Sequence, residues 1–317
     1  MSEFKLLLIS AGFEHGGNVT HRHFDGHKDL LVYPFESQLG NYNFHDFLSS
    51  IERVQYRYPE FQEGLSPIEM YENIIDEELK TFLRKRNGSK FRDVDLIMDE
   101  NKRKDAFVKR MGNKSRYVRK DAIEAFFRST FDSWENYYIK PKDDMVYVGY
   151  SPAIGIDSNR ILYDFPNAKI IHIIRNPFSA YRDTKRRPFP LNITKYLITW
   201  NIYHSTVNIY SNLYPNNVKI VRYEDIISDK ENTMKDIAKF VGIEYSDSLL
   251  YPSWNSVKIE KDIAPWGTVL RADTEYNKSI IDELTKDEKY EISIATEAIA
   301  KHFKYNEIEY LKKFYDK

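Results

Sequence analysis

Two segments of the sequence have residue types and spacings that suit phosphate binding. The first covers residues 12–20 and reads Gly-Phe-Glu-His-Gly-Gly-Asn-Val-Thr. Its Gly12 and Gly17 have the Gly-x4-Gly spacing of loops whose backbone N–H groups, with the N-terminus of the next helix, bind an anion. The candidate anion-binding residues are Gly16, Gly17, Asn18, Val19 and Thr20. A plain strand-to-helix turn is the alternative.

The second segment is Ile-Ile-His-Ile-Ile-Arg-Asn-Pro, which ends in Arg175 and Pro177. Arg175 follows an apolar run, and strand ends of an open parallel sheet face the ligand crevice. Pro177 is typical of a first helical position, so Asp183 and Thr184 would follow two turns into that helix on the same side. An anion would explain Arg175 at such a place, and a structural salt bridge is the alternative.

Composition excludes several classes of function. The chain has 317 residues, with 47 Lys and Arg against 48 Asp and Glu, so no overall basic field exists to bind nucleic acid. Its lack of cysteine excludes thiol chemistry and fits a reducing compartment, so we expect a cytoplasmic protein. No apolar run approaches the ~18 residues that span a membrane. Hydrophobic content of 42% indicates a folded protein.

The elements that position these segments follow from hydrophobic periodicity. Apolar runs predict strands at 4–10, 30–33, 145–149, 169–174 and 218–223. Helical patterns separate them, including one over 229–240 that Gly242 would end. This alternation predicts an α/β fold with a central parallel sheet flanked by helices. We expect one domain over residues 1–317, with a helical insertion at about 44–140.

Inside the insertion, three stretches have a helical pattern. They are residues 44–54, residues 66–86, where Ser66 and Glu69 form a capping box, and residues 119–138. The stretch 87–120 is dense in Lys and Arg. A solvated loop is one interpretation, and a gate over an anionic ligand is the other.

Several motifs in this order resemble the nucleotide-dependent sulfotransferases. Residues 12–20 resemble the family's 5′-phosphosulfate loop, and Asp25-Gly-His27-Lys-Asp-Leu30 its Asp-x-His-x-x-Leu stretch. Arg175-Asn-Pro resembles its 3′-phosphate segment, and Tyr223-Glu-Asp with the following helix resembles a third family segment. The resemblance implies a P-loop-like fold and transfer of a sulfuryl group from 3′-phosphoadenosine 5′-phosphosulfate (PAPS). It implies a hydroxyl or amine acceptor, on a small molecule or a carbohydrate, and no obligatory metal.

The resemblance also assigns roles to single residues. Arg175 matches the arginine that binds the 3′-phosphate, Tyr223 matches a tyrosine beside the adenine, and Gly267 and Arg271 match a loop with further phosphate contacts. The family serine eight residues after the arginine is Asp183 here. Where relatives have Lys or Arg before Ser-Gly-Thr-Thr, this chain has His15, which either supplies the missing positive charge or simply lines the turn.

The proton acceptor of the reaction is predicted at Glu36. This residue follows the second strand and resembles in position the catalytic glutamate of the protein-tyrosine sulfotransferases, while a surface glutamate that caps the next segment is the alternative. Glu36 and His15 are thus the candidate catalytic residues. A zinc site at His23 and His27 would need a third ligand with recognised spacing, which does not follow, so no metal is expected.

Two other functions are compatible with the sequence. The altered loop at residues 12–20 would suit a degenerate, non-catalytic nucleotide-binding protein. The second function is that of a phosphotransferase for a small metabolite. Such an enzyme would need Lys followed by Ser or Thr in this loop to reach the phosphates and Mg²⁺, whereas this chain has Asn18 and Val19.

Overall fold

Five parallel strands form the centre of the molecule. The structure, a computed structural model, describes residues 3–43, 45–188, 190–260 and 274–305. The strands are β1 (Lys5–Ala11), β2 (Leu30–Val32), β3 (Val146–Tyr150), β4 (Lys169–Ile174) and β5 (Val218–Arg222). Their order in the sheet is β2-β3-β1-β4-β5, with every pairing parallel. All five predicted strands are confirmed to within one or two residues at each end.

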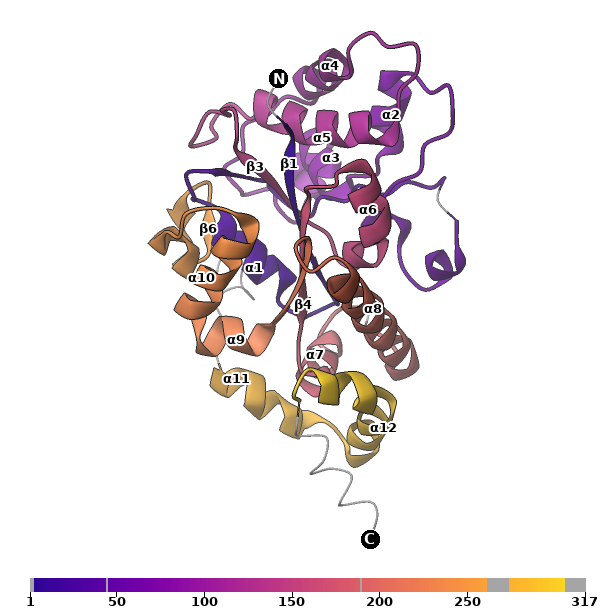
Figure 1. Cartoon of the computed structure of the whole chain (residues 1–317), viewed down its shortest axis with the longest axis vertical. Coiled ribbons are helices and arrows are strands. Elements are labelled where there is room, and N and C mark those ends of the chain that lie inside the picture. The colour runs from indigo at the N-terminus through magenta and orange to yellow at the C-terminus, as the bar shows by residue number, and fades with distance from the viewer. Residues whose placement is uncertain (1–2, 44, 189, 261–273, 306–317) are drawn as a thin grey trace.

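Helices cover both faces of this sheet. One face packs against α1 (Gly17–Phe24), α9 (Tyr223–Ser228) and α10 (Lys230–Val241), and the other against α6 (Ser158–Asp164) and α8 (Ile193–Leu213). Figure 1 shows these two groups on opposite sides of β1 and β4. Along β1, Leu6 and Leu8 belong to one apolar cluster while Leu7 and Ile9 belong to the other, because successive strand side chains point to opposite faces. The predicted α/β class is confirmed.

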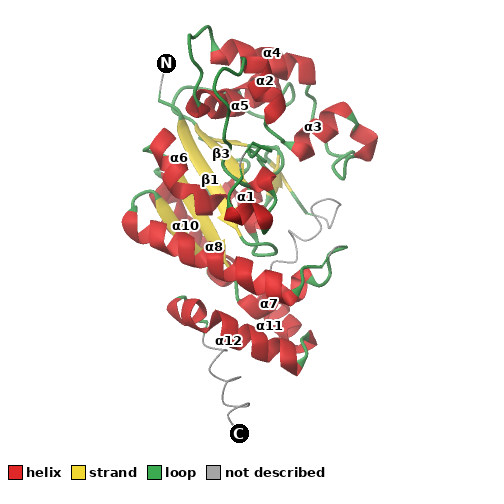
Figure 2. Cartoon of the chain, turned by 90° about the vertical axis from the view of Figure 1, so that its right-hand side faces the viewer, coloured by secondary structure: helices red, strands yellow, loops and turns green. Residues whose placement is uncertain are grey.

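The remaining helices lie toward the two ends of the molecule. α2 (Pro67–Asn73), α3 (Glu77–Arg84), α4 (Glu100–Met111) and α5 (Arg119–Ser133) come between β2 and β3 and cover one end. Figure 2 shows α7 (Pro177–Thr184), α11 (Thr274–Ser279) and α12 (Lys286–His302) toward the other end. A two-stranded hairpin, β6 (Ser253–Trp254) and β7 (Val257–Lys258), packs beside α1.

Three predictions inside the insertion are wrong in detail. Residues 44–54 do not form one helix, because their described part contains only short 3₁₀ turns at Phe47–Ser50 and Val54–Tyr56. The helix predicted over 66–86 is two helices, separated at Asp76, whose φ is 40°. The basic stretch 87–120 is not simply a loop, because it contains α4. The predicted capping box at Ser66 and Glu69 is present.

Candidate functional site

The loop between β1 and α1 is shaped by two aromatic rings. Gly16 has a φ of 82°, and a Cβ there would lie 2.3 Å from Cδ2 of Tyr223. A Cβ on Gly17 would lie 2.4 Å from Cε2 of Tyr150. Only glycine fits both positions, because one needs a positive φ and both lie against a ring. The first-turn N–H groups of α1, which have no intrahelical partner, follow directly after this loop.

The loop residues named from the sequence divide into two sets. Gly16, Gly17, Asn18 and Val19 line a cavity of about 410 Å³. Thr20 is fully buried, and both its hydroxyl and its N–H donate to the Gly16 carbonyl at 3.0 Å. Its side chain therefore stabilises the first turn of the helix, and Thr20 is not among the residues that line the cavity.

Arg175 lies at the carboxyl end of β4 and reaches the same cavity. Its Nε donates to Asn277 Oδ1 at 2.8 Å, and its Nη1 donates to the Glu14 carbonyl at 2.6 Å. The guanidinium carbon lies 4.8 Å from the ring centroid of Tyr223. Arg175 thus connects the loop at residues 12–20 with α11.

The same arginine is ion-paired with Asp183, as the salt-bridge alternative anticipated. Arg175 Nη1 lies 2.8 Å from Asp183 Oδ2, and Arg182 Nη1 lies 3.1 Å from Asp183 Oδ1. Arg175 directly follows β4, and Arg182 and Asp183 lie on α7. The carboxylate partly neutralises Arg175, and it would repel a phosphate placed beside it.

Glu224, in the Tyr-Glu-Asp segment, fixes the turn that follows β4. Its Oε1 accepts the backbone N–H of Asn176 at 3.0 Å, and its Oε2 accepts the hydroxyl of Tyr305 at 2.8 Å. Asn176 in turn caps α7, because its Oδ1 accepts the N–H of Phe178 at 2.9 Å. Glu224 therefore positions Arg175 indirectly, by holding the residue after it.

Glu36 lies beyond the end of β2 and lines the cavity. It is half-buried, and its Oε2 accepts from Gln38 Nε2 at 3.3 Å. Burial and the nearby carboxylate of Glu78 together raise the pKa of Glu36 to about 8, although Lys90 lowers it. Lys90 lies 2.5 Å from Glu78 Oε1. A carboxylate with a pKa near 8 is a stronger proton acceptor than an exposed glutamate.

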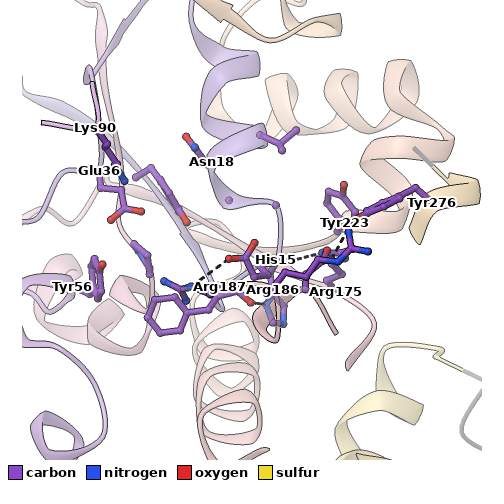
Figure 3. Close-up of a pocket in the computed structure, with 18 residues that line it drawn as sticks. His15, Asn18, Glu36, Tyr56, Lys90, Arg175, Arg186, Arg187, Tyr223 and Tyr276 are labelled. Carbon is purple, nitrogen blue, oxygen red and sulfur yellow. Dashed lines mark hydrogen bonds and ion pairs between the residues drawn. The ribbon is translucent and has the colours of Figure 1, made fainter. Parts of the chain in front are cut away.

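The carboxyl ends of all five strands meet at this cavity, which is where open α/β sheets bind ligands. Figure 3 shows Glu36, Lys90 and Tyr56 on one side of the loop and Arg175, Tyr223 and Tyr276 on the other. Sequence reasoning missed several of the lining residues: Phe13, Glu14, Tyr56, Lys90, Tyr150, Pro152, Arg186, Arg187 and Tyr276. Tyr150 ends β3, so its place at a strand end could have identified it. Lys90 comes from the basic stretch 87–120.

His15 also lies at the cavity, but its ring is buried. Its Nδ1 lies 2.7 Å from the Phe13 carbonyl, and its Nε2 lies 3.2 Å from Nε2 of His204. Burial and the charge of Arg175 together lower the pKa of His15 to about 3, although its bond to the Phe13 carbonyl raises it. These contacts favour the interpretation in which a neutral His15 lines the turn. Cationic side chains at the cavity are those of Lys90, Arg175, Arg186 and Arg187.

Two further expectations concern residues elsewhere. Gly267 and Arg271 lie outside the described residues. His23 Nδ1 lies 2.8 Å from the Leu249 carbonyl, and His27 Nε2 lies 2.8 Å from the Glu244 carbonyl. In the described part of the chain, no group of three or more His, Cys, Asp or Glu side chains is arranged to hold a metal ion.

Comparison with protein families decides the assignment. The model of the sulfotransferase family matches residues 65–247, more than half of the chain. The chain belongs to the sulfotransferase family. It is therefore a transferase. A search of curated proteins found no significant match to its sequence.

Three solved sulfotransferase structures are similar to this chain. The sulfotransferase domain from the curacin biosynthetic pathway is similar with a TM-score of 0.51 and 18% identity, over 96% of this chain and 98% of that one. The sulfotransferase domain of the Synechococcus PCC 7002 olefin synthase gives 0.48 and 14%, over 89% and 94%. A sulfotransferase from Alicyclobacillus acidocaldarius gives 0.40 and 14%, over 91% and 100%. The first match identifies the P-loop-like sulfotransferase fold in this chain.

Among the described helices of this sulfotransferase, none combines the length and the apolar character that crossing a membrane requires.

Proposed function

We propose that this sulfotransferase moves a sulfuryl group from PAPS to a hydroxyl or amine of a small-molecule or carbohydrate acceptor. The observation that supports the proposal is the meeting of three features at one cavity: the N-terminus of α1 with its glycine loop, Arg175, and the raised-pKa carboxylate of Glu36. Each lies where a parallel strand ends. We include a cytoplasmic location in the proposal, supported by the lack of cysteine.

The reaction needs two kinds of group on opposite sides of the transferred sulfur. Charge develops on the oxygen between the sulfuryl group and the departing 5′-phosphate, so hydrogen-bond donors or cations there stabilise the transition state. The acceptor must lose a proton on the other side. The positions in Figure 3 support this division, with Arg175 and Tyr223 on the nucleotide side and Glu36 on the acceptor side of the loop.

We assign the donor contacts as follows. Backbone N–H groups of Gly16, Gly17, Asn18 and Val19 would bind the 5′-phosphosulfate, because the helix N-terminus attracts negative charge. Arg175 would bind the 3′-phosphate and Tyr223 would pack beside the adenine. We assign no direct ligand contact to the Thr20 side chain, whose hydroxyl is bonded within the helix.

Glu36 is the proposed general base. Its carboxylate would accept the proton of the acceptor hydroxyl or amine as the new bond to sulfur forms. Its pKa of about 8 favours this role, because a base whose pKa lies near the working pH combines proton affinity with a usable ionised fraction. The aromatic rings of Phe13 and Tyr56, 5.8 Å apart at their centroids, line the same cavity as Glu36 and suit an acceptor with an apolar body.

The test is a product assay with the purified full chain, sulfur-labelled PAPS and a panel of phenols, sugars and amines. Transfer of label to an acceptor supports the proposal, and mass spectrometry would identify the product. Glu36→Gln should reduce turnover by roughly 10²–10⁴ while nucleotide binding persists. Glu77→Gln, an exposed glutamate on α3, is the matched control and should keep normal turnover.

Two outcomes would favour the other functions. Nucleotide binding without transfer to any acceptor would favour a degenerate nucleotide-binding protein, for which the altered loop at residues 12–20 is the supporting feature. Phosphate transfer that requires a nucleoside triphosphate and Mg²⁺ would instead favour a phosphotransferase.

A further inference from the structure

Three buried histidines from three different elements are joined end to end beneath the loop at residues 12–20. His15 Nε2 lies 3.2 Å from Nε2 of His204 on α8, and His204 Nδ1 lies 2.8 Å from Nε2 of His172 on β4. Each of the three side chains is at most 2% exposed. We call these residues the histidine chain. None of the roles assigned above to the sulfotransferase reaction uses His172 or His204.

The groups at the two ends of the histidine chain determine its proton positions. The Phe13 carbonyl can only accept, so His15 Nδ1, 2.7 Å away, must carry a proton. At the other end, His172 Nδ1 lies 3.0 Å from the hydroxyl of Ser10, and Ser10 Oγ accepts the N–H of Gly155 at 2.9 Å. A hydroxyl that already accepts this bond can donate its own proton to His172.

With three neutral rings, every bond then has one donor and one acceptor. Ser10 donates to His172 Nδ1, His172 Nε2–H donates to His204 Nδ1, and His204 Nε2–H donates to the unprotonated Nε2 of His15. All bonds point in one direction, toward the loop. A second proton on His15 would force each bond to reverse, and Ser10 Oγ would then accept from both His172 and Gly155.

We propose that His172 and His204 are positioning residues that hold His15 as the neutral Nδ1–H tautomer and so fix the anion-binding loop to β4 and α8. The ring of His15 supports the loop from within, because a Cβ on Gly12 would lie 2.7 Å from its Cε1 and Nδ1. The loop then presents backbone N–H groups to the ligand, without a cationic side chain at position 15. The binding part of this proposal rests on the proposed function.

The residues around the histidine chain favour three neutral imidazole rings in fixed positions. The ring of Trp200 packs edge-on against His204 with centroids 4.6 Å apart, and Arg175 is the cation that acts on His15. Burial lowers the pKa of His172 to about 3. The His172 end of the histidine chain meets Ser10 and Gly155, both of which are buried.

The first test is nitrogen-15 NMR of the imidazole rings in the wild-type protein, which needs neither ligand nor activity. The expected spectrum shows His15 as the Nδ1–H tautomer and His172 and His204 as Nε2–H tautomers, unchanged between about pH 6 and 8, the range in which an ordinary histidine titrates. A doubly protonated or Nε2–H form of His15 in that range would overturn the proposal.

The second test measures the affinity for 3′-phosphoadenosine 5′-phosphate by calorimetry. His204→Leu breaks the chain and should weaken binding by up to about ten-fold, the equivalent of one net hydrogen bond. His204→Gln can donate and accept through its amide, as the ring does, and should restore most of the affinity. His302→Leu, on the surface of α12, is the control for loss of an imidazole and should bind as the wild type does.

The outcomes separate this proposal from the proposed function. If the wild type binds no nucleotide, the proposed function fails, and the NMR result still decides whether the chain has the stated tautomers. If a folded His204→Leu variant binds as tightly as the wild type, the positioning role is wrong although the function stands. Should His204→Leu not fold, His172→Leu provides the same comparison: weaker nucleotide binding than in the wild type supports the positioning role, and wild-type affinity overturns it.

Discussion

At the scale of single residues, the proposed base role of Glu36 predicts how turnover depends on pH. Burial and the Glu78 carboxylate raise its pKa to about 8, so at lower pH most molecules carry a protonated, inactive Glu36. Turnover should therefore rise about ten-fold per pH unit toward pH 8 and then level off. A pH–rate profile of the wild type measures this directly.

Substitutions of two charged neighbours of Glu36 should shift this pH–rate profile in opposite directions. Glu78→Gln removes the second carboxylate, so the pKa of Glu36 should fall and the profile should shift to lower pH. Lys90→Met removes a cation that lowers the pKa of Glu36, so the profile should shift to higher pH. Identical profiles in all three proteins would show that another group limits the rate.

Arg175 and Asp183 form the second residue-scale prediction. Arg175→Ala should weaken binding of 3′-phosphoadenosine 5′-phosphate by ~1.5–3 kcal/mol, the range for a hydrogen bond to a charged group. Asp183→Ser removes the carboxylate 2.8 Å from Arg175 and should strengthen binding by about ten-fold. Calorimetry with adenosine 5′-phosphate, which lacks the 3′-phosphate, is the control and should show little change with Asp183→Ser. Equal affinity for both nucleotides in every variant would remove Arg175 from the 3′-phosphate site.

At the scale of elements, the loop between β1 and α1 depends on Gly16. An Ala there would need a φ of 82° and a Cβ 2.3 Å from the Tyr223 ring, so loop or ring must move. We expect Gly16→Ala to abolish nucleotide binding and to lower the melting temperature. Gly88→Ala, where a Cβ meets nothing within 4 Å, should bind and melt as the wild type does. Nucleotide binding by Gly16→Ala at wild-type affinity would contradict the assigned loop.

Most of the strands could be predicted from the sequence because they are short, nearly continuous apolar runs buried on both faces, whereas β5 contains Lys219 and Arg222 and is only partly buried. The run KIIHII gives β4 with the predicted bounds, Lys169–Ile174. The loop at residues 12–20 and Arg175 follow two such strands, so their meeting at one edge followed from the parallel order. The pairing of His172 with His204 could not be predicted, because it depends on how α8 packs against the sheet.

Helix α4 of the insertion was harder to predict, because a charged residue occupies one of its buried positions. In α4 the buried side chains are Arg103, Phe107 and Met111, at i, i+4 and i+8. An arginine at one of these positions hides the apolar stripe that identifies a helix. Likewise, the pattern over 66–86 continues through Asp76, although this residue turns out of the helix and becomes the partner of Arg103.

At the scale of the whole molecule, the insertion and the sheet share one apolar cluster. This cluster contains Leu6, Leu8 and Leu31 from the strands and Phe107 and Phe126 from the insertion helices. A buried polar network joins the same parts. Arg103 Nη1 donates to Asp76 Oδ2 at 2.7 Å, and Tyr33, just after β2, donates its hydroxyl to Asp76 Oδ1 at 2.8 Å.

The expectation of one domain over residues 1–317 can be tested by asking whether the insertion and the sheet unfold together. Arg103 and Asp76 are both 0% exposed, so Arg103→Met leaves a buried carboxylate without its cation and should cost ~3–5 kcal/mol of unfolding free energy. Arg110→Met removes an ion pair with Asp132 at the surface of the insertion and should cost at most about 1 kcal/mol. If insertion and sheet unfold together, scanning calorimetry should show one transition in each protein, with the Arg103→Met transition lower by on the order of 5–10 °C. Two transitions, of which Arg103→Met moves only one, would show that the insertion unfolds as a separate unit despite the shared cluster.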